Sequence, residues 1–183
     1  MTTIRPAMAA DAAQIAAIYN QGIEERGATF ETRQRSVAEM SARVADGGRH
    51  PLLVACDADG SILGWAGLGD YRARDCYAGI AEFSVYLDRH ARRRGVGRLL
   101  LEALVAAARE RGHWKLVSRI FTFNTASLAL CRAVGFREVG VYEKHGRLDG
   151  QWLDVVIVER LITENLVPSQ AATAAVQSSR SIQ

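Results

Sequence analysis

A short arginine- and glycine-rich segment, Arg92–Arg98, joins a strand-like run at 81–87 to a long run with helical apolar spacing. The first N–H groups of a helix have no partner within the helix, and the helix dipole favours negative charge there. Gly95 and Gly97 allow a ligand to approach the backbone closely, and four arginines add positive charge. The segment therefore predicts a pyrophosphate-binding turn, with an exposed basic turn that only caps a helix as the alternative.

The two commonest nucleotide-binding motifs do not fit this segment. A Walker loop requires Gly-Lys-Ser/Thr, whereas Gly97 is followed by Arg98 and Leu99. The dinucleotide fingerprint requires a third glycine or an alanine where this chain has Leu100. What remains is an Arg-x-x-Gly-x-Gly motif at the start of a helix.

Length and composition favour one globular domain. The chain has 183 residues, of which 49% are hydrophobic, enough for one full core. From residue 167 onward it turns to Ser, Ala, Gln and Thr with little periodicity. We therefore expect a single domain over residues 1–164 and a flexible tail over 165–183.

The charge balance and the cysteines exclude several classes of protein. The 23 Lys and Arg residues nearly balance 20 Asp and Glu, so the basic character is local and does not predict nucleic-acid binding. Cys56, Cys76 and Cys131 lie far apart, which argues against a disulfide framework or a zinc site. The histidines show no metal-ligand spacing. With no apolar signal core and no apolar run of roughly eighteen residues, we expect a cytoplasmic protein that does not enter a membrane.

The apolar pattern predicts alternating strands and helices. Asp11 is expected to cap the first helix, and Ser36-x-x-Glu39 is a capping box that opens the second. A turn at 146–150 is expected between the last two strands. The predicted strands are 3–6, 52–56, 62–68, 81–87, 115–121, 136–142 and 152–161, and the predicted helices are 12–25, 37–45, 95–110 and 124–134.

Two motifs and this order of elements resemble the GNAT superfamily of N-acetyltransferases over residues 2–162. The Arg-x-x-Gly-x-Gly segment resembles its acetyl-coenzyme A motif, and Asn124-x-x-Ser127 with the later Gly135-Phe136 resembles its cofactor-contacting helix. The resemblance implies an α/β fold with a mixed, mainly antiparallel sheet that splays open between its fourth and fifth strands. It also implies acetyl-CoA as co-substrate.

Three further segments are similar to the phosphinothricin N-acetyltransferase group within this superfamily: 71–77, 81–87 and 150–155. That group, with relatives that act on methionine sulfoximine and arsinothricin, acetylates the α-amine of glutamate-like toxins. The resemblance implies such an activity here, a role in resistance to the toxin, a small amino-acid-like substrate and a homodimer.

The chemistry of this reaction gives Glu82 a role. An α-amine is mostly an ammonium ion at neutral pH and cannot attack a thioester until a base removes its proton. Glu82, at the start of the strand beside the cofactor, is the candidate base, directly or through a water. The alternative is a strand-end glutamate that pairs with a surface arginine.

The substrate's acidic groups need positive charge, and Arg72 and Arg74 are the candidates because guanidinium groups match carboxylate, phosphinate and arsinate oxygens. Residues i and i+2 of an extended segment point the same way, so both can face one ligand. They can instead be solvated loop charges. Phe30 corresponds to a family position that lines the substrate pocket, although an ordinary core aromatic is the alternative. Arg147 offers a third contact or merely caps a hairpin.

The resemblance also implies how acetyl-CoA is held. The backbone of Val85, Tyr86 and Leu87 is expected to pair with its pantetheine arm like an added strand, and an N–H near Val85 to stabilise the oxyanion. The residues expected at the pyrophosphate and the pantetheine arm are Arg93, Arg94, Gly95, Val96, Gly97, Arg98, Asn124 and Ser127. Asn124 can equally be a simple helix N-cap.

Two positions depart from the family pattern. Cys131 stands where many members have a tyrosine that protonates the leaving thiolate, so no dedicated acid is assured. Leu153 stands where some herbicide-resistance members have histidine. Other interpretations therefore stay open: acetylation of protein N-termini or another small amine, a coenzyme A sensor without turnover, or a nucleic-acid-binding module.

Overall fold

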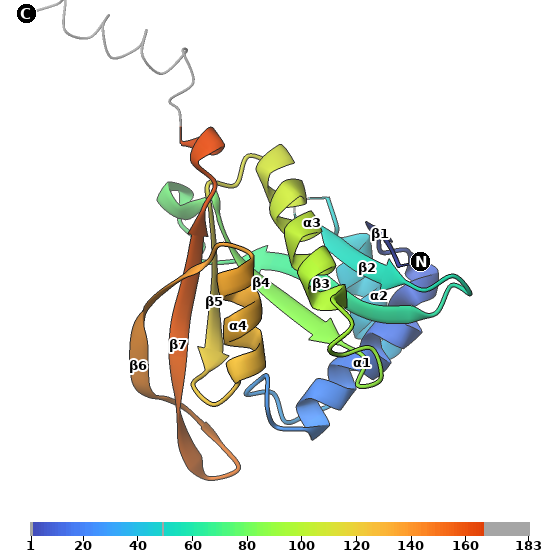
Figure 1. The fold of residues 1–183 in the computed structure, drawn as a ribbon, viewed down its shortest axis with the longest axis horizontal. Helices are drawn as coiled ribbons and strands as arrows, with labels where there is room; N and C mark the ends of the chain where they lie inside the picture. The colour runs from blue at the N-terminus through green and yellow to red at the C-terminus, as the bar shows by residue number, and fades with distance from the viewer. Residues whose placement is uncertain (1, 49, 167–183) are drawn as a thin grey trace, which may run out of the picture.

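A seven-stranded mixed sheet of order β1-β2-β3-β4-β5-β7-β6 organises the molecule (Figure 1). The computed structural model describes residues 2–48 and 50–166, so the predicted tail lies, from residue 167, outside the described residues. The strands are β1 (Thr3–Pro6), β2 (Leu52–Cys56), β3 (Ile62–Asp70), β4 (Ile80–Leu87), β5 (Lys115–Phe121), β6 (Arg137–Leu148) and β7 (Gln151–Leu161). The helices are α1 (Ala12–Glu24), α2 (Val37–Ala45), α3 (Val96–Glu110) and α4 (Thr125–Ala133), with 3-10 turns η1 (Ala9–Asp11), η2 (Asp75–Tyr77) and η3 (Thr163–Asn165).

Helices cover both faces of the sheet, and the strand sequences reflect this. In β2, Leu53 and Ala55 pack against α3, whereas Leu52, Val54 and Cys56 pack against α1 on the opposite face. Every residue of β2 is buried, because successive side chains of a strand point to opposite faces and both faces are covered. No helix in the described part of the chain is both long and apolar enough to cross a membrane.

The predicted start of α2 is confirmed and that of α1 needs a correction. Ser36 accepts a hydrogen bond from the Glu39 N–H, and the Glu39 carboxylate accepts one from the Ser36 N–H, which is the capping box. Asp11 does precede α1, but its carboxylate accepts hydrogen bonds from the Met8 N–H and from Arg5. Those bonds to Arg5 hold the pKa of Asp11 below its usual value. Its side chain therefore ties β1 to the helix start instead of capping the helix.

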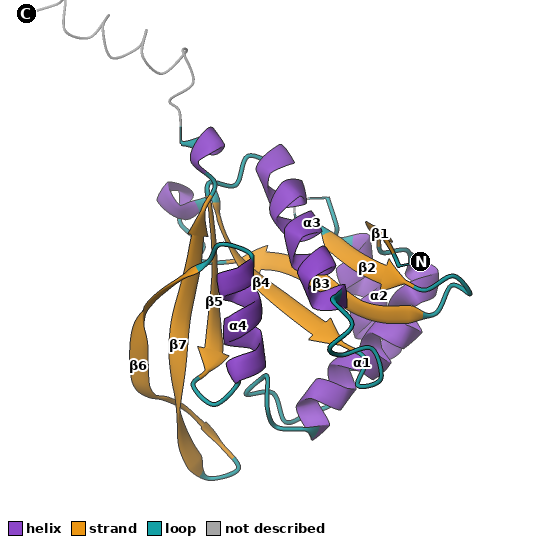
Figure 2. Ribbon diagram, viewed as in Figure 1, coloured by secondary structure: helices purple, strands orange, loops and turns teal. Residues whose placement is uncertain are grey.

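The parallel pairing of β4 with β5 is short, and it determines where a ligand can enter. The strands pair in register only at Ile80↔Lys115, Ala81↔Leu116 and Glu82↔Val117. Beyond Glu82 the two strands separate, as the diverging arrows in Figure 2 show. All other neighbours in the sheet are antiparallel. The predicted mixed sheet, splayed between the fourth and fifth strands, is thus confirmed.

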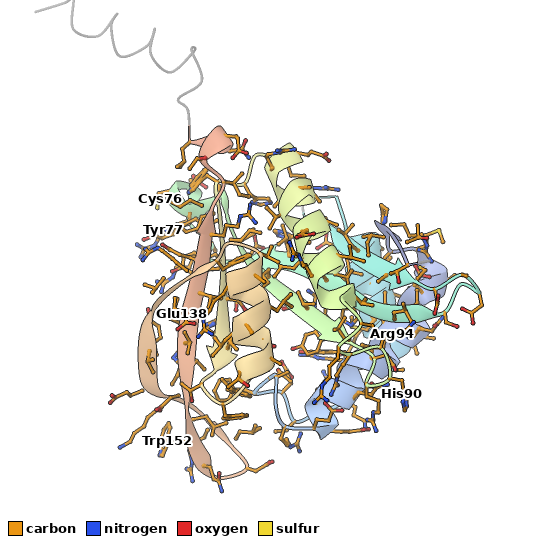
Figure 3. All side chains as sticks on the ribbon, in the orientation of Figure 1. Cys76, Tyr77, His90, Arg94, Glu138 and Trp152 are labelled. Carbon is orange, nitrogen blue, oxygen red and sulfur yellow. The ribbon has the colours of Figure 1, made fainter. Side chains whose placement is uncertain are left out.

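The last hairpin is longer than the sequence indicates. β6 continues to Leu148, six residues past its predicted end, so the predicted turn at 146–150 shrinks to Asp149 and Gly150. Both residues have positive φ, of 47° and 83°, as a tight two-residue hairpin turn requires. Irregular register between Tyr142 and Gly146 lets β6 bend, and Trp152 projects away from the body of the molecule near this tip (Figure 3).

Gly79 and Trp114 are in close contact at the point where the pairing of β4 with β5 begins. A Cβ at Gly79 would lie 1.9 Å from Cε3 of the Trp114 ring. The backbone N–H of Trp114 donates to the Gly79 carbonyl at 2.8 Å. Gly79→Ala should therefore lower the free energy of unfolding by about 1–3 kcal/mol through overpacking, measured by urea denaturation. Gly69→Ala in β3 is the matched control, because no atom lies within 4 Å of its added Cβ. Equal unfolding midpoints for the two variants would contradict this account.

Candidate active site

A cavity of about 650 Å³ lies where β4 and β5 separate. Its walls come from β4, β5, the α1–α2 loop and α4 with its N-cap, and single residues are added by α1, α3 and β6. The volume is within the range of small-molecule sites, roughly 300–1,000 Å³. Of the substrate and catalytic residues that the sequence suggests, Glu82 and Phe30 line the cavity and Arg72 and Arg74 do not.

Glu82 sits at the last paired position before the strands separate, and its carboxylate meets Arg119 of β5. The Nη2 atom of Arg119 lies 2.5 Å from both Glu82 oxygens, and its Nε lies 3.2 Å from Oε1. These hydrogen bonds raise the pKa of Arg119 above its usual value, so the guanidinium is charged at every working pH. The side chain of Glu82 is 29% exposed and that of Arg119 is 47% exposed, so a ligand can reach the pair.

The outer half of β4 offers a free backbone edge toward β5. Residues 83–87 pair with β3 on one side and, among the described residues, have no strand partner on the other. The side chain of Tyr86 turns to the α1 face, where its ring stacks on Trp65 and meets Tyr19 edge-on. The Tyr86 ring therefore does not cover the strand edge toward β5. The backbone of Val85, Tyr86 and Leu87 can pair there with an extended chain.

The predicted phosphate turn leads into α3 with an uncapped helix end. Gly95 has φ of 79° at the N-cap and supplies no side-chain cap, and the first turn of α3 contains no acidic residue. Gly97 is buried, and its added Cβ would lie 3.2 Å from Leu130 of α4 and 3.3 Å from Leu87. Close packing of α3 against α4 and the end of β4 therefore explains why position 97 is a glycine.

The arginines of this turn differ in their partners. Arg98 donates to Glu102 at 2.7 Å, and Arg94 lies 3.6 Å from Asp57. Arg93 is exposed, has φ of 61° and has no ion pair with any residue that the structure describes. Figure 3 shows Arg94 on this loop, on the other side of the molecule from Trp152. The turn can therefore offer at least one uncommitted guanidinium to an anion.

Asn124 is confirmed as an N-cap and has a second partner. Its Oδ1 accepts from the Ser127 N–H at 3.1 Å, and its Nδ2 donates to the Gly27 carbonyl at 2.9 Å. Asn124 and Ser127 both line the cavity. The side chain of Asn124 therefore fixes the start of α4 to the loop that forms the opposite wall.

Phe30 closes the wall beside β6. Its ring meets Phe121 edge-on with centroids 4.8 Å apart, and it packs on Gly146, where an added Cβ would lie 2.7 Å away. Phe30 is thus both a lining residue and part of a small apolar cluster, which also contains Leu153.

Arg147 donates to the Gly150 carbonyl at 3.3 Å, and its guanidinium lies over the Trp152 ring. Its contacts are therefore those of a hairpin cap.

The premise that Arg72 and Arg74 share an extended segment is wrong. The Arg74 N–H bonds to the Arg72 carbonyl at 2.9 Å, and η2 follows at once, so the chain turns sharply here. The Arg72 guanidinium instead lies over the Tyr71 ring, 5.4 Å from its centroid. Because Gly69 of β3 pairs with Glu82 and β3 ends at Asp70, this exposed loop begins close to the cavity.

Cys131 lines the cavity but is poorly suited to give up a proton. Burial raises its pKa to about 12, above that of an ordinary thiol. The Cys131 thiol is therefore a weaker acid than a free thiol, and donating its proton to a leaving thiolate would be unfavourable. Among the described residues, no group of three or more His, Cys, Asp or Glu side chains is placed to hold a metal ion.

Three basic side chains that line the cavity, Arg33, Arg119 and His145, were missed from the sequence. Arg33 pairs with Glu39, and His145 lies on β6, whose bend could not be foreseen. Arg119 carried a usable signal, because a charged residue in the interior of the predicted strand 115–121 is unusual for a central strand.

Comparisons with known proteins agree with this geometry. A family model described as an acetyltransferase (GNAT) domain matches residues 4–157. The L-methionine sulfoximine/L-methionine sulfone acetyltransferase of Pseudomonas aeruginosa is 36% identical over 174 residues, which cover 93% of this chain and 98% of that protein.

Two solved structures are similar over most of their length. A phosphinothricin acetyltransferase from Sinorhizobium meliloti, in complex with AcCoA, has a TM-score of 0.82 and 34% identity, covering 87% of this chain and 88% of its own. A ribosomal-protein-alanine N-acetyltransferase from Brucella melitensis has a TM-score of 0.83 and 33% identity, covering 87% of this chain and 99% of its own.

Proposed function

This chain belongs to the GNAT family of acetyltransferases and is an acetyl-CoA-dependent N-acetyltransferase of the phosphinothricin and methionine sulfoximine type, and we propose that it acetylates the α-amine of a glutamate-analogue toxin. Phosphinothricin, methionine sulfoximine and arsinothricin are the candidate substrates, and acetylation would confer resistance to them. The observation that carries the proposal is the position of Glu82. Its carboxylate lies in the cavity at the point where β4 loses its partner strand.

The described residues fit acetyl-CoA as co-substrate. The open edge of Val85, Tyr86 and Leu87 suits pairing with the amide groups of the pantetheine arm. Asn124 and Ser127 lie across the cavity from that edge. The α3 N-terminus, which lacks an acidic residue and a side-chain cap, suits the pyrophosphate together with Arg93, Arg94 and Arg98. When bound, acetyl-CoA supplies an acetyl group activated as a thioester.

Glu82 acts as the general base in this proposal. It takes one proton from the substrate's ammonium group, and the neutral amine then attacks the acetyl carbon. The nitrogen loses its second proton to solvent as the amide bond forms. The carbon–sulfur bond breaks, and the thiolate takes its proton from solvent because Cys131 is too weak an acid. A backbone N–H near Val85 stabilises the oxyanion before the thiolate leaves.

Positive charge for the substrate's side-chain acid comes from Arg72 and Arg74. Both are exposed on the loop that follows β3, which begins close to Glu82 because Gly69 pairs with that residue, and guanidinium groups there suit an incoming anion. Phe30 forms the apolar wall against which the methylene groups of such a substrate would pack.

The test of the function is thiol release from acetyl-CoA with phosphinothricin, methionine sulfoximine, arsinothricin and short peptides as acceptors. The wild-type protein should release thiol fastest with one of the amino acids. Glu82→Gln should lower turnover by about 10²- to 10⁴-fold, because the ammonium then has no positioned base. Binding of acetyl-CoA should remain, since no cofactor contact is removed.

Each alternative function has its own outcome in that experiment. Faster acetylation of peptides would favour protein N-termini as substrates. Binding of coenzyme A without thiol release would favour a sensor, and salt-sensitive nucleic-acid binding without protection by coenzyme A would favour a binding module. An unchanged rate in Glu82→Gln would remove that residue from the mechanism.

Arg93 provides a test of the cofactor site. Since its guanidinium has no protein partner among the described residues, Arg93→Gln should raise the KM for acetyl-CoA about 10-fold through loss of a charge-assisted phosphate contact, with kcat nearly unchanged. Arg89→Gln is the control, because Arg89 lies in the same loop but pairs with Glu24. If both variants change KM equally, the effect is only the general loss of positive charge.

We propose that two copies of the chain pair through β6. This edge strand is twelve residues long and exposes Val139, Val141 and Tyr142, which are 48%, 52% and 55% accessible. A long edge strand with exposed apolar side chains is a template for pairing with a second chain.

Sedimentation should therefore show about twice the 20.0 kDa chain mass for the wild type and mainly monomer for Val141→Asp, because the charge would be buried in the interface. Val37→Asp is the control, since Val37 is 51% exposed at the start of α2, away from this edge. A monomeric wild type would overturn the proposal.

A further inference from the structure

Arg119 holds Glu82 with only part of its guanidinium group. Its Nε and Nη2 atoms make all of the hydrogen bonds to the carboxylate. Its Nη1 atom makes no hydrogen bond with any residue in the described part of the chain. A guanidinium has five N–H groups in a fixed plane, so the Nη1 side remains available for a second oxyanion. Arg119 is 47% exposed and lines the cavity, so that side is within reach of a ligand.

The two charges of the Glu82–Arg119 pair are complementary to the two charges of a free amino acid. In a free amino acid the ammonium nitrogen and the carboxylate carbon are bonded to the same carbon, about 2.5 Å apart from standard bond lengths. The pair presents a carboxylate and a guanidinium in direct contact. A substrate ammonium at Glu82 therefore brings its own carboxylate next to Arg119, and each charge then has a neighbour of opposite sign.

We propose that Arg119 binds the α-carboxylate of the substrate, so that the Glu82–Arg119 pair recognises the ammonium and the carboxylate of a free amino acid together. This inference rests on the proposed function, because it takes the α-amine to be bound at Glu82. Arg72 and Arg74 are then left for the acidic side chain of the substrate.

Two consequences follow from this assignment. A peptide N-terminus has an amide where a free amino acid has its carboxylate, so Arg119 selects against peptides. Sharing the guanidinium with the substrate's carboxylate also weakens its hold on Glu82, which leaves that carboxylate a better acceptor for the ammonium proton. Substrate binding and activation of the base are thereby coupled through one side chain.

The test compares L-methionine sulfone with its α-carboxamide as acceptors. The side chain of methionine sulfone is neutral, so the α-carboxylate is its only anionic group and Arg72 and Arg74 have no acid to bind. Rates are expressed per fraction of unprotonated amine, because the amide lowers the pKa of the neighbouring ammonium group. The wild type should prefer the acid to the carboxamide by about 10- to 100-fold in kcat/KM, as expected for a charge-assisted pair.

Arg119→Gln should remove this preference. It should raise the KM for the acid about 10- to 100-fold and change the KM for the carboxamide by less than about threefold. Arg119→Lys keeps the charge without the planar fork and should restore part of the preference. Arg132→Gln, on an exposed arginine that pairs with Glu138, should behave as wild type. Thermal unfolding of each variant checks that the fold is intact.

The outcomes separate this inference from the proposed function. If the wild type acetylates the acid and the carboxamide equally well, the inference fails while the function stands, whatever the variants do. If Arg119→Gln slows both acceptors equally, Arg119 only positions Glu82 and the inference also fails. If the wild type releases no thiol with any amino acid, the proposed function fails and the inference with it.

Discussion

The loss of hydrogen bonding between β4 and β5 after Glu82 is the constraint on which the site depends. Parallel strands in the middle of a sheet normally stay paired, because buried backbone N–H and C=O groups need partners. Here the pairing ends after three register positions, and the freed edge of β4 faces a cavity. An extended amide-containing ligand can satisfy that edge. In the proposed function, the pantetheine arm of acetyl-CoA takes this place in the sheet.

Several residues around the separation of β4 and β5 shape the cavity. Gly79 allows the Trp114 ring to lie against the start of the parallel pair, and Gly97 allows α3 to approach both α4 and the end of β4. Asn124 ties α4 to the α1–α2 loop across the cavity. An α3 first turn without an acidic residue is unfavourable for an isolated helix and favourable beside an anion. The contacts of Gly79, Gly97 and Asn124 thus hold the elements around the cavity in place.

Most of the fold could be predicted from the sequence because its signals are local. The capping box at Ser36 and the apolar periodicity of the strands depend on residues close in sequence, and they placed most elements within a residue or two. The contact of Glu82 with Arg119 could not be predicted, because it depends on the register Glu82↔Val117. Once that register is known, Arg119 follows, since residues 117 and 119 share one face of β5.

The Glu82–Arg119 ion pair is partly exposed, and this bears on whether it serves stability or binding. An ion pair that is open to solvent contributes only about 0–1 kcal/mol to stability, so the fold does not require it. Position 119 is exposed in the middle of the sheet, so packing does not require a particular side chain there, and the charged group that the chain places there lines the cavity. A group of little value to folding, held beside the proposed base, is best explained by what it binds. Because the two roles are energetically separate, substitutions at Arg119 can change substrate recognition while leaving the fold intact.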